Sequence, residues 1–356
     1  MDLDGILKGV SRSFYLTLRV APARVRRQLG VAYLFCRAAD TIADTALVPP
    51  ERRLALLDSY RAQFAGEASG IPALQALSRE LTDAQSIPEE RILLESLDRC
   101  FGAYMEFPEP DRALIRRLVT TLSRGMEMDL RSFPLAAALP PGPVPPGGSP
   151  EPAALATDED LDRYCYHVAG CVGEFWTDLA LANLPALRRW DPARLRALGV
   201  RFGKGLQMTN VLRDIPEDLR RGRCYIPRTR LEAAGIAPAD LRGGGTRQQP
   251  LTDRLRPVVD DLLDLTLQHY RAGWAYTLSI PARAPRLRLA CAWPLLIGLE
   301  TLALLRTRTG NLLAGETLRI PQNTVWRILA GTLVLVFSRR CLNGIYQGLE
   351  VGALRR

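Results

Sequence analysis

The chain has little histidine and no closely spaced cysteines. Only two of its 356 residues are histidine, and its seven cysteines are scattered without a CxxC pair. An odd, scattered set of cysteines argues against a disulfide framework and against a structural zinc site. Two histidines argue against histidine-based catalysis and histidine-rich metal binding. The chemistry of this protein must therefore come from other side chains.

Targeting signals and long apolar runs are also missing. The chain starts Met-Asp-Leu-Asp, without the basic and then apolar pattern of a signal peptide. Its longest clean apolar run, residues 328–337, is shorter than the roughly 20 residues that span a bilayer. We therefore expect a cytoplasmic protein. The run predicts either a buried core helix, which we favour, or a peripheral contact with the inner face of the membrane.

Lysine is nearly absent, although the net charge is +9. Of 47 basic residues only Lys8 and Lys204 are lysines. Arginine suits phosphate esters, anionic membranes or nucleic acid, and codon bias is an equally good explanation of the surplus. A nucleic-acid-binding protein would concentrate arginines in one segment with interleaved aromatic residues. No such segment occurs, so we expect no nucleic-acid partner, and no feature indicates an obligate protein partner.

Helical periodicity runs through most of the chain, and strand-like alternation is nowhere sustained. Apolar residues recur at helical spacing in residues 54–64 and 255–267, for example. Residues 134–156 and 242–250 are rich in proline or glycine and predict surface loops. With 47% hydrophobic residues the chain can bury a large core. We predict an all-α, single-domain helical bundle over residues 1–356, with about ten or more helices.

Two pairs of aspartates carry the strongest chemical signal. Asp40 and Asp44 are spaced one helical turn apart, and so are Asp214 and Asp218. Residues four apart share one face of a helix. If the two faces meet, their carboxylates surround a site suited to Mg²⁺. Such a site predicts an enzyme that uses the metal to hold a diphosphate.

The neighbours of each pair strengthen this interpretation. Tyr33 and Arg37 fall on the face of Asp40, although a solvated face with an arginine–aspartate ion pair would give the same pattern. Gln207 and Asn210 share the face of Asp214, and they need partners if buried. Pro216 cannot donate the helical bond to Leu212, so the position of Asp218 is less certain. The arginines that follow, with Arg223 and Tyr225 among them, either bind a diphosphate or form plain surface charge.

Four ordered motifs resemble those of the squalene/phytoene synthase family, whose members join two prenyl diphosphates head to head. They are SRSF at residues 11–14, YLFCRAADTIAD at 33–44, YCYHVAGCVG at 164–173, and residues 207–218 with GRCY at 222–225. Looser similarity continues through residues 291–294 to the C-terminal region. The resemblance implies an isoprenoid-synthase bundle in which both aspartate pairs face a central cavity.

The resemblance also implies roles for individual residues. Asp40, Asp44, Asp214 and Asp218 would bind Mg²⁺, with Asn210 as a further candidate ligand. The residues implied in catalysis are Phe14, Tyr33, Arg37 and Tyr164. Those implied in substrate binding are Ser11, Ser13, Arg37, Val168, Ala169, Val172, Gly173, Gln207, Asn210, Arg213, Arg223 and Tyr225. Arg213 lies off the Asp214 face of an ideal helix, so its role is the least secure. The small residues of 168–173 either leave room for prenyl chains or allow close helix packing.

Within this family we favour squalene synthase, and thus a precursor of hopanoids or sterols. The resemblance then implies that two farnesyl diphosphates give presqualene diphosphate, which is reduced by NADPH to squalene. The alternatives are phytoene, dehydrosqualene or presqualene diphosphate synthases, which use no reductant. The chain lacks a Rossmann fingerprint, which does not exclude NADPH in this family. A catalytically lapsed assembly factor of the same fold is the non-enzyme alternative, but it would be expected to lose its aspartates.

Overall fold

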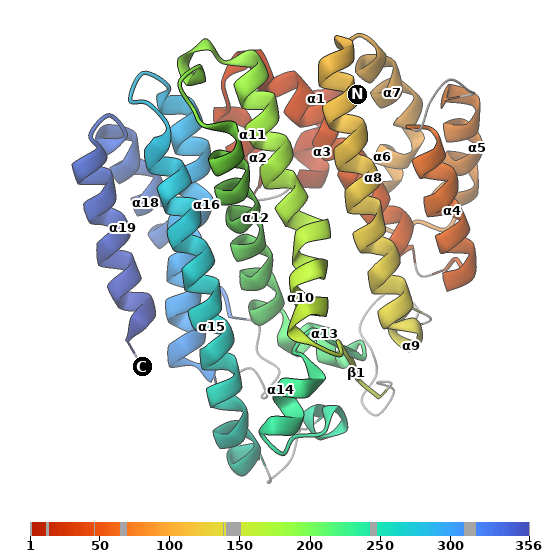
Figure 1. Ribbon diagram of the computed structural model, residues 1–356. Coiled ribbons are helices and arrows are strands. Elements are labelled where there is room, and N and C mark those ends of the chain that lie inside the picture. Colours follow the sequence, from red (N-terminus) through yellow and green to blue (C-terminus); the bar gives the residue numbers. More distant parts are fainter. Residues whose placement is uncertain are drawn as a thin grey trace.

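A computed structural model describes residues 2–11, 14–45, 47–64, 70–137, 139, 151–242, 248–309 and 318–355. Almost all of these residues are helical (Figure 1), which confirms the predicted all-α fold. The helices of the N-terminal half are α1 (Leu3–Ser11), α2 (Tyr15–Val20), α3 (Ala23–Asp44), α4 (Pro50–Ala62), α5 (Gly70–Thr82), α6 (Pro88–Glu95), α7 (Leu97–Met105), α8 (Glu109–Ser132) and α9 (Pro134–Ala137).

The C-terminal half continues the helical bundle. In chain order these are α10 (Asp158–Cys165), the π-helix η2 (Tyr166–Gly170), α11 (Cys171–Asn183), the 3₁₀ turn η3 (Pro185–Leu187), α12 (Pro192–Arg213), α13 (Ile215–Arg220), α14 (Arg228–Ala233), the 3₁₀ helix η4 (Pro238–Arg242), α15 (Gln248–Ser279), α16 (Pro285–Thr307), α18 (Gln322–Leu335) and α19 (Arg339–Leu354). The 24-residue α8 and 22-residue α12 run through the middle of the bundle (Figure 1).

Both predicted loops are more structured at their edges than the sequence indicates. Residues 134–137 form the short helix α9, because proline is tolerated where no helical N–H bond is needed. Ala153–Ala154 forms β1, which pairs in parallel with β2 (Arg223–Cys224). Residues 248–250 already belong to α15. Most of the remaining residues of the two predicted loops, 140–150 and 243–247, lie outside the described part of the chain.

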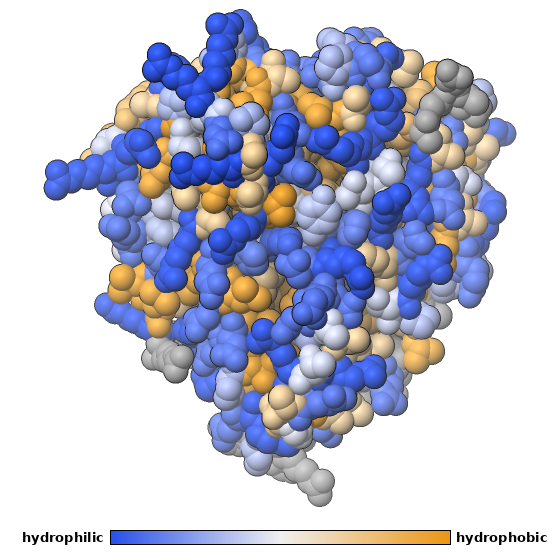
Figure 2. All heavy atoms as spheres, viewed as in Figure 1, coloured by the Kyte–Doolittle hydropathy of each residue, from blue (hydrophilic) through white to orange (hydrophobic). Residues whose placement is uncertain are grey.

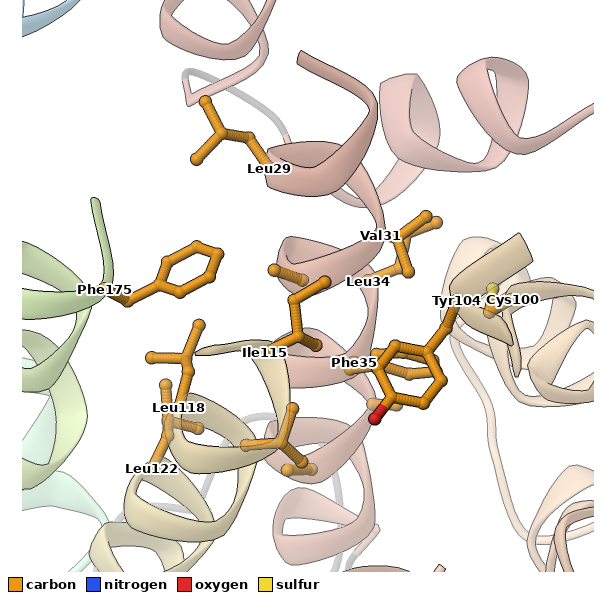
Figure 3. Packing of buried hydrophobic residues seen from close by; sticks show 14 of the residues in the cluster. Leu29, Val31, Leu34, Phe35, Cys100, Tyr104, Ile115, Leu118, Leu122 and Phe175 are labelled. Atoms are coloured by element: carbon orange, nitrogen blue, oxygen red, sulfur yellow. The ribbon is translucent and has the colours of Figure 1, made fainter. Parts of the chain in front are cut away.

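Two apolar cores hold the bundle together. In the first, α3 packs against α8 and α11, and the sticks in Figure 3 show Leu34 of α3, Leu118 of α8 and Phe175 of α11 in this cluster. The second core joins α10, α12, α15, α16 and α19. Phe202 of α12 packs against both clusters. The motif residues of η2 and α11 lie along the same boundary, since Val168 borders the second core and Val172 borders the first.

Glycines bring α11 and η2 very close to α12. A Cβ added to Gly173 would lie 1.8 Å from the carbonyl oxygen of Gly199, and one added to Gly203 would lie 2.0 Å from that of Ala169. Neither position could carry a side chain without moving the backbone. The small residues of this segment therefore provide close helix packing, which was one of the two interpretations of the sequence. The role of Ala169 and Gly173 in binding prenyl chains stays a prediction.

Two C-terminal helices bear on a contact with membranes. Among the described helices α16 alone has the length and apolar content of a membrane span, and 72% of its apolar window is buried inside the bundle. The apolar run 328–337 in α18 and just beyond is not the buried core helix that we favoured. Ile328 and Leu329 are buried, but Leu333, Val334 and Phe337 are exposed. Helical periodicity could not reveal which face is exposed, because both faces of the helix are apolar.

Candidate active site

The first aspartate pair lies at the C-terminal end of α3. Arg37 forms ion pairs with Asp40 on its own helix and with Glu90 of α6. Glu90 is 6% exposed, and it also accepts a hydrogen bond from Thr41 at 3.4 Å. The arginine–aspartate pair of the solvated-face interpretation is therefore present, but it is joined to a buried carboxylate. Arg37 consequently lies at a partly buried junction between two helices.

The second pair lies where α12 ends. α12 stops at Arg213, Asp214 is the junction, and α13 starts with Pro216 in its first turn. The helix breaks at the proline, as predicted, but backbone hydrogen bonds of helical spacing continue across the break. The Asp214 N–H donates to Asn210 O and the Asp218 N–H to Asp214 O, both at 2.9 Å. Asp218 thus stays one turn beyond Asp214.

Arg223 joins the two pairs through a carboxylate that the sequence did not single out. Its Nη1 is 3.0 Å from Asp129 Oδ2 of α8, and its Nη2 is 3.9 Å from Asp44 Oδ1. Arg223 and Asp218 line the same small void, of about 10 Å³, beside Tyr225. That volume is roughly the space of one water molecule. Arg223 and Asp129 therefore lie between Asp44 and the α13 aspartate.

The backbone around Arg223 is fixed by the small parallel sheet. Ala153 N–H donates to Gly222 O at 3.0 Å, and Leu155 N–H donates to Cys224 O at 3.1 Å. Gly222 has a φ of 78°, a left-handed conformation that favours glycine. The glycine of the GRCY motif thus makes the turn from α13 into β2. This turn places Arg223 beside Asp129.

Crowded carboxylates shift the proton equilibria of the site. Burial, together with Asp44 and further neighbouring carboxylates, raises the pKa of Asp40 to about 7 despite the nearby Arg37. Burial also raises the pKa of Asp218 well above its ordinary value, and Asp214 and Asp129 add to the effect. Burial raises the pKa of Asp129 as well, while Arg223 and the Tyr225 hydrogen bond oppose it. Three carboxyl groups of the site are therefore buried and crowded enough to resist losing their protons.

Aromatic rings pack against this acidic cluster. Tyr225 donates a hydrogen bond from its hydroxyl to Asp129. Its ring stacks on Tyr164 at 4.8 Å and meets Phe133 edge-on at 5.0 Å. Burial raises the pKa of both tyrosines well above the ordinary value, so both hydroxyls stay protonated at neutral pH. Tyr164 is thus close to the carboxylates, as a reaction-centre role requires.

The N-terminal motif lies against α3. Phe14 stacks on Tyr33 with ring centroids 5.8 Å apart, and the Tyr33 hydroxyl is 3.5 Å from Val10 O. The Ser11 hydroxyl donates to the carbonyl of Leu7 within its own helix, so in this conformation it is engaged locally. Ser13 lies outside the described residues. Phe14, directly before α2, is thereby held against Tyr33 of α3, the helix that carries the first aspartate pair.

The remaining predicted residues differ in what they contact. Arg213 donates two hydrogen bonds to Asp214, at 2.8 and 2.6 Å. Its side chain therefore reaches this aspartate, although the two residues would lie on different faces of an ideal helix. Asn210 is exposed and lies 3.5 Å from the Gln207 oxygen, so it does not need a buried partner. Val168 and Val172 are half-buried between the two cores. Contacts of these residues with a substrate stay predictions.

Asp129 and Glu90 are the functional candidates that the sequence analysis missed. Each is a single carboxylate, without a partner at helical spacing that would mark it. The available signal for Asp129 was its place between Met128 and Leu130, where a charge interrupts the apolar residues of α8. Glu90 follows Pro88 and Glu89, and this pattern is typical of the first turn of a helix. Only the packing of α6 and α8 on α3 reveals their roles.

The donor set fits a magnesium ion in its chemistry. Asp40, Asp44, Asp214 and Asp218 supply hard oxygen ligands. Burial and neighbouring carboxylates raise the pKa values of Asp40 and Asp218, and a bound cation would relieve that repulsion. Within the described residues, no three or more Asp, Glu, His or Cys side chains are already gathered closely enough to hold a metal. The buried Nε atoms of Arg37 and Arg223 have no partner among these residues, so they can each donate to an added anion.

Comparison with known proteins identifies the family. The sequence profile described as squalene/phytoene synthase matches residues 7–325. The chain belongs to the squalene/phytoene synthase family. It is 30% identical over 264 residues to a presqualene diphosphate synthase of Zymomonas mobilis, covering 74% of this chain and 70% of that protein. It is 29% identical over 279 residues to a bifunctional lycopene cyclase/phytoene synthase of Colletotrichum graminicola, covering 77% of this chain but only 41% of that protein.

Structural similarity extends over nearly all of the chain. A solved structure of TcSQS with a bound ligand superposes with a TM-score of 0.70 at 21% identity, covering 99% of this chain and 96% of the other. At that identity the likeness shows the fold alone. Family membership makes this chain a prenyltransferase of the squalene/phytoene synthase type. The product that it makes is a separate question.

Proposed function

We propose that this protein condenses two farnesyl diphosphates head to head into presqualene diphosphate, at the site between α3, α8 and α12–α13. The observation that carries the proposal is the position of Arg223, 3.0 Å from Asp129 and 3.9 Å from Asp44, in a void that Asp218 also lines. One basic side chain thereby links both aspartate pairs. A diphosphate at this position would meet carboxylates from both sides.

The charged residues would act on the leaving group. Bound at Asp40, Asp44, Asp214 and Asp218, Mg²⁺ would supply the positive charge that lets the diphosphate depart. Arg37 and Arg223 would each donate a hydrogen bond to a diphosphate oxygen through the Nε that now has no partner. Arg213 would hold Asp214 in place through its two hydrogen bonds. These residues stabilise charge as it develops on departing oxygens, which is where binding lowers a barrier most.

The aromatic residues would act on the cation. In the condensation, C1 of one farnesyl chain bonds to the C2=C3 unit of the other, with loss of diphosphate and one proton. The allylic cation must be kept from water, and the faces of Phe14, Tyr33 and Tyr164 can stabilise it. The buried tyrosine hydroxyls stay protonated, so they would not capture the cation as phenolates.

The room for two prenyl chains must come from the boundary between the two cores. The void beside Asp218 holds only about 10 Å³, whereas a ligand of this size needs several hundred. Val168 and Val172 are half-buried on that boundary, next to helices that are already in contact. We infer that substrate binding separates side chains there. This boundary is also where the substrate-binding residues of α11 were predicted.

The reductive step to squalene with NADPH remains our prediction for the second half of the reaction. The similarity to a presqualene diphosphate synthase supports the first half only. The similarity to an enzyme named for phytoene synthesis keeps the longer C20 substrate open as an alternative. All four aspartates are present, and the pKa values of Asp40 and Asp218 are raised in a crowded carboxylate site, which disfavours a lapsed assembly factor. The length of prenyl chain that the site accepts and the need for NADPH are therefore to be determined with the purified protein.

The deciding experiment incubates the purified chain with Mg²⁺ and either farnesyl or geranylgeranyl diphosphate, with and without NADPH. Products are identified by mass spectrometry before and after phosphatase treatment. Presqualene diphosphate from farnesyl diphosphate without NADPH would support the proposal, and squalene appearing only with NADPH would add the second half. Phytoene from geranylgeranyl diphosphate, with no product from farnesyl diphosphate, would contradict it. No product from either substrate would favour the assembly factor.

A further inference from the structure

The outward face of α18 is an exposed apolar stripe. Trp326, Leu333, Val334 and Phe337 are 60%, 52%, 76% and 63% exposed. With Ala330 they stand at helical spacing i, i+4, i+7, i+8 and i+11, so they lie on one side of the helix and its C-terminal extension. We call these five residues the α18 stripe. Among the described residues nothing covers it.

The inner face of the same helix is firmly packed. Leu329 and Val336 form a small core with Leu289 and Trp293 of α16. The Trp293 indole N–H donates to the Thr332 hydroxyl at 2.8 Å. The fully buried Arg288 donates to Val336 O at 2.6 Å. Exposure of the stripe is therefore not loose packing, because α18 is held in one orientation and presents these side chains outward.

Positive charge surrounds the stripe. Residues 318–355 contain five arginines and one glutamate, Glu350. That glutamate is engaged by Arg271 at 2.7 Å. Arg327 lies next to Trp326, is 77% exposed at its side chain and is 3.9 Å from Glu300 of α16. Arg339 and Arg340 follow Phe337 after Ser338 and are exposed. An apolar face with a tryptophan and a rim of arginines fits the interface of an anionic bilayer.

We propose that the α18 stripe docks this protein on an anionic membrane surface. The stripe would enter the boundary between headgroups and acyl chains, and Arg327, Arg339 and Arg340 would contact lipid phosphates. The charge pattern decides between occupants, because a second copy using the same face would bring like-charged arginines together across a two-fold axis. In Figure 1, α18 and α19 lie at one edge of the bundle, where a flat surface can reach them. Orange surface also lies over the C-terminal part of α19 in Figure 2, where Val351 and Leu354 are exposed.

Vesicle co-sedimentation of the full chain tests this directly. We expect binding to vesicles of phosphatidylcholine with about one third phosphatidylglycerol, weaker binding to pure phosphatidylcholine, and a decline with added salt. The double substitution Val334→Ser with Phe337→Ser should weaken binding about tenfold or more. A matched control, Ile71→Ser with Met105→Ser, removes two apolar side chains that are 42% and 50% exposed on α5 and α7. This control should bind as the wild type does.

Tryptophan fluorescence gives a second readout. Trp326 is the one exposed tryptophan of the five. Vesicles that contain brominated lipid should quench emission of the wild type, and Trp326→Phe should remove that quenching. No binding of the wild type to anionic vesicles, or equal loss in the control variant, would overturn the proposal. The proposal would also be overturned if the wild type does not bind vesicles but forms a dimer, and the Val334/Phe337 double variant is a monomer.

This inference does not depend on the proposed reaction. The binding assay needs no substrate, and the substituted residues are not among the candidate catalytic or binding residues. A chain that binds vesicles but makes no prenyl product would refute the proposed function alone. A chain that makes presqualene diphosphate but fails to bind vesicles would refute the membrane contact alone.

Discussion

The two aspartate pairs have the same spacing but different support. Asp40 and Asp44 lie on the uninterrupted α3, whose last turn is held by Arg53, a buried residue that donates to Ala43 O at 2.6 Å. Asp214 and Asp218 straddle the break between α12 and α13. Equal spacing in sequence thus corresponds to one pair fixed by a buried arginine and another fixed by a helix junction.

The charge on each pair differs as well. Both oxygens of Asp214 accept hydrogen bonds from Arg213, so this carboxylate is largely neutralised. Asp40 has Arg37 nearby, but Arg37 is shared with the buried Glu90. Burial and the surrounding carboxylates then raise the pKa of Asp40 to about 7. Each pair therefore contains one carboxylate whose pKa is raised by burial and like charge, Asp40 in one and Asp218 in the other, whereas Asp214 is already paired with an arginine.

The largest expected effect is loss of turnover when either pair is broken. Asp40→Ala and Asp214→Ala should each lower the rate of diphosphate release from farnesyl diphosphate by about a thousandfold or more, because charge on the leaving group is no longer neutralised. Melting temperatures should stay near that of the wild type. Glu217→Ala is the control, since Glu217 is exposed on α13 and pairs only with Arg220 among the described residues. Near-normal rates in either aspartate variant would remove that pair from the site.

Breaking the link between the pairs should affect both activity and stability. Arg223→Gln leaves Asp129 buried without its ion-pair partner, which should lower the free energy of unfolding by about 3 kcal/mol and the turnover by about a hundredfold. Adding Asp129→Asn should restore much of the stability without restoring turnover. Urea unfolding and the product assay measure the two effects. Stability that stays low in the double variant would show that Arg223 has another structural role.

The support of the α3 pair can be tested with two neighbouring arginines. Arg53→Met leaves the buried carbonyls of Ala43 and Ala137 without this donor, which should cost about 1–3 kcal/mol and lower turnover because the last turn of α3 loosens. Arg52→Met removes an exposed pair with Glu80 and should cost less than about 1 kcal/mol. If both variants lose the same stability, the buried contact does not hold α3 in place.

The raised pKa of Asp40 should make the stability of the metal-free protein depend on pH. Because the pKa of Asp40 is about 7, the folded chain keeps a proton there that the unfolded chain releases near pH 4. The free energy of unfolding should therefore decrease as pH rises from about 4 to 7 and then level off. Asp40→Asn should reduce this slope in urea titrations at several pH values, and the slope that remains should come from Asp218 and Asp129, whose pKa values are also raised. If the wild type and the variant show the same pH dependence, the pKa of Asp40 is not raised in the folded chain.

Much of the fold and the main parts of the site follow from sequence pattern. Apolar periodicity predicts the helices around residues 54–64 and 255–267, since each buries one face. Pro216 correctly marks the end of α12, but not the continued bonding that keeps Asp218 in line with Asp214. The four-residue spacing needs only helix geometry, so it could be recognised without any tertiary information.

Features that depend on contacts between distant helices could not be predicted. Asp129 meets Arg223 across 94 positions of sequence, and no local pattern marks a single carboxylate as a partner. The outward face of α18 was missed for a related reason. When both faces of a helix are apolar, periodicity cannot tell which one is buried, and only the packing of α16 decides it.

The measurement that tests the account most directly is a double-mutant cycle between the two aspartate pairs. Asp44→Asn, Asp218→Asn and the double variant are compared by the rate of Mg²⁺-dependent diphosphate release from farnesyl diphosphate. If Arg223 and Asp129 make the pairs one site, the double variant should lose about as much activity as the worse single variant. Losses that multiply, as for two independent sites, would contradict the account.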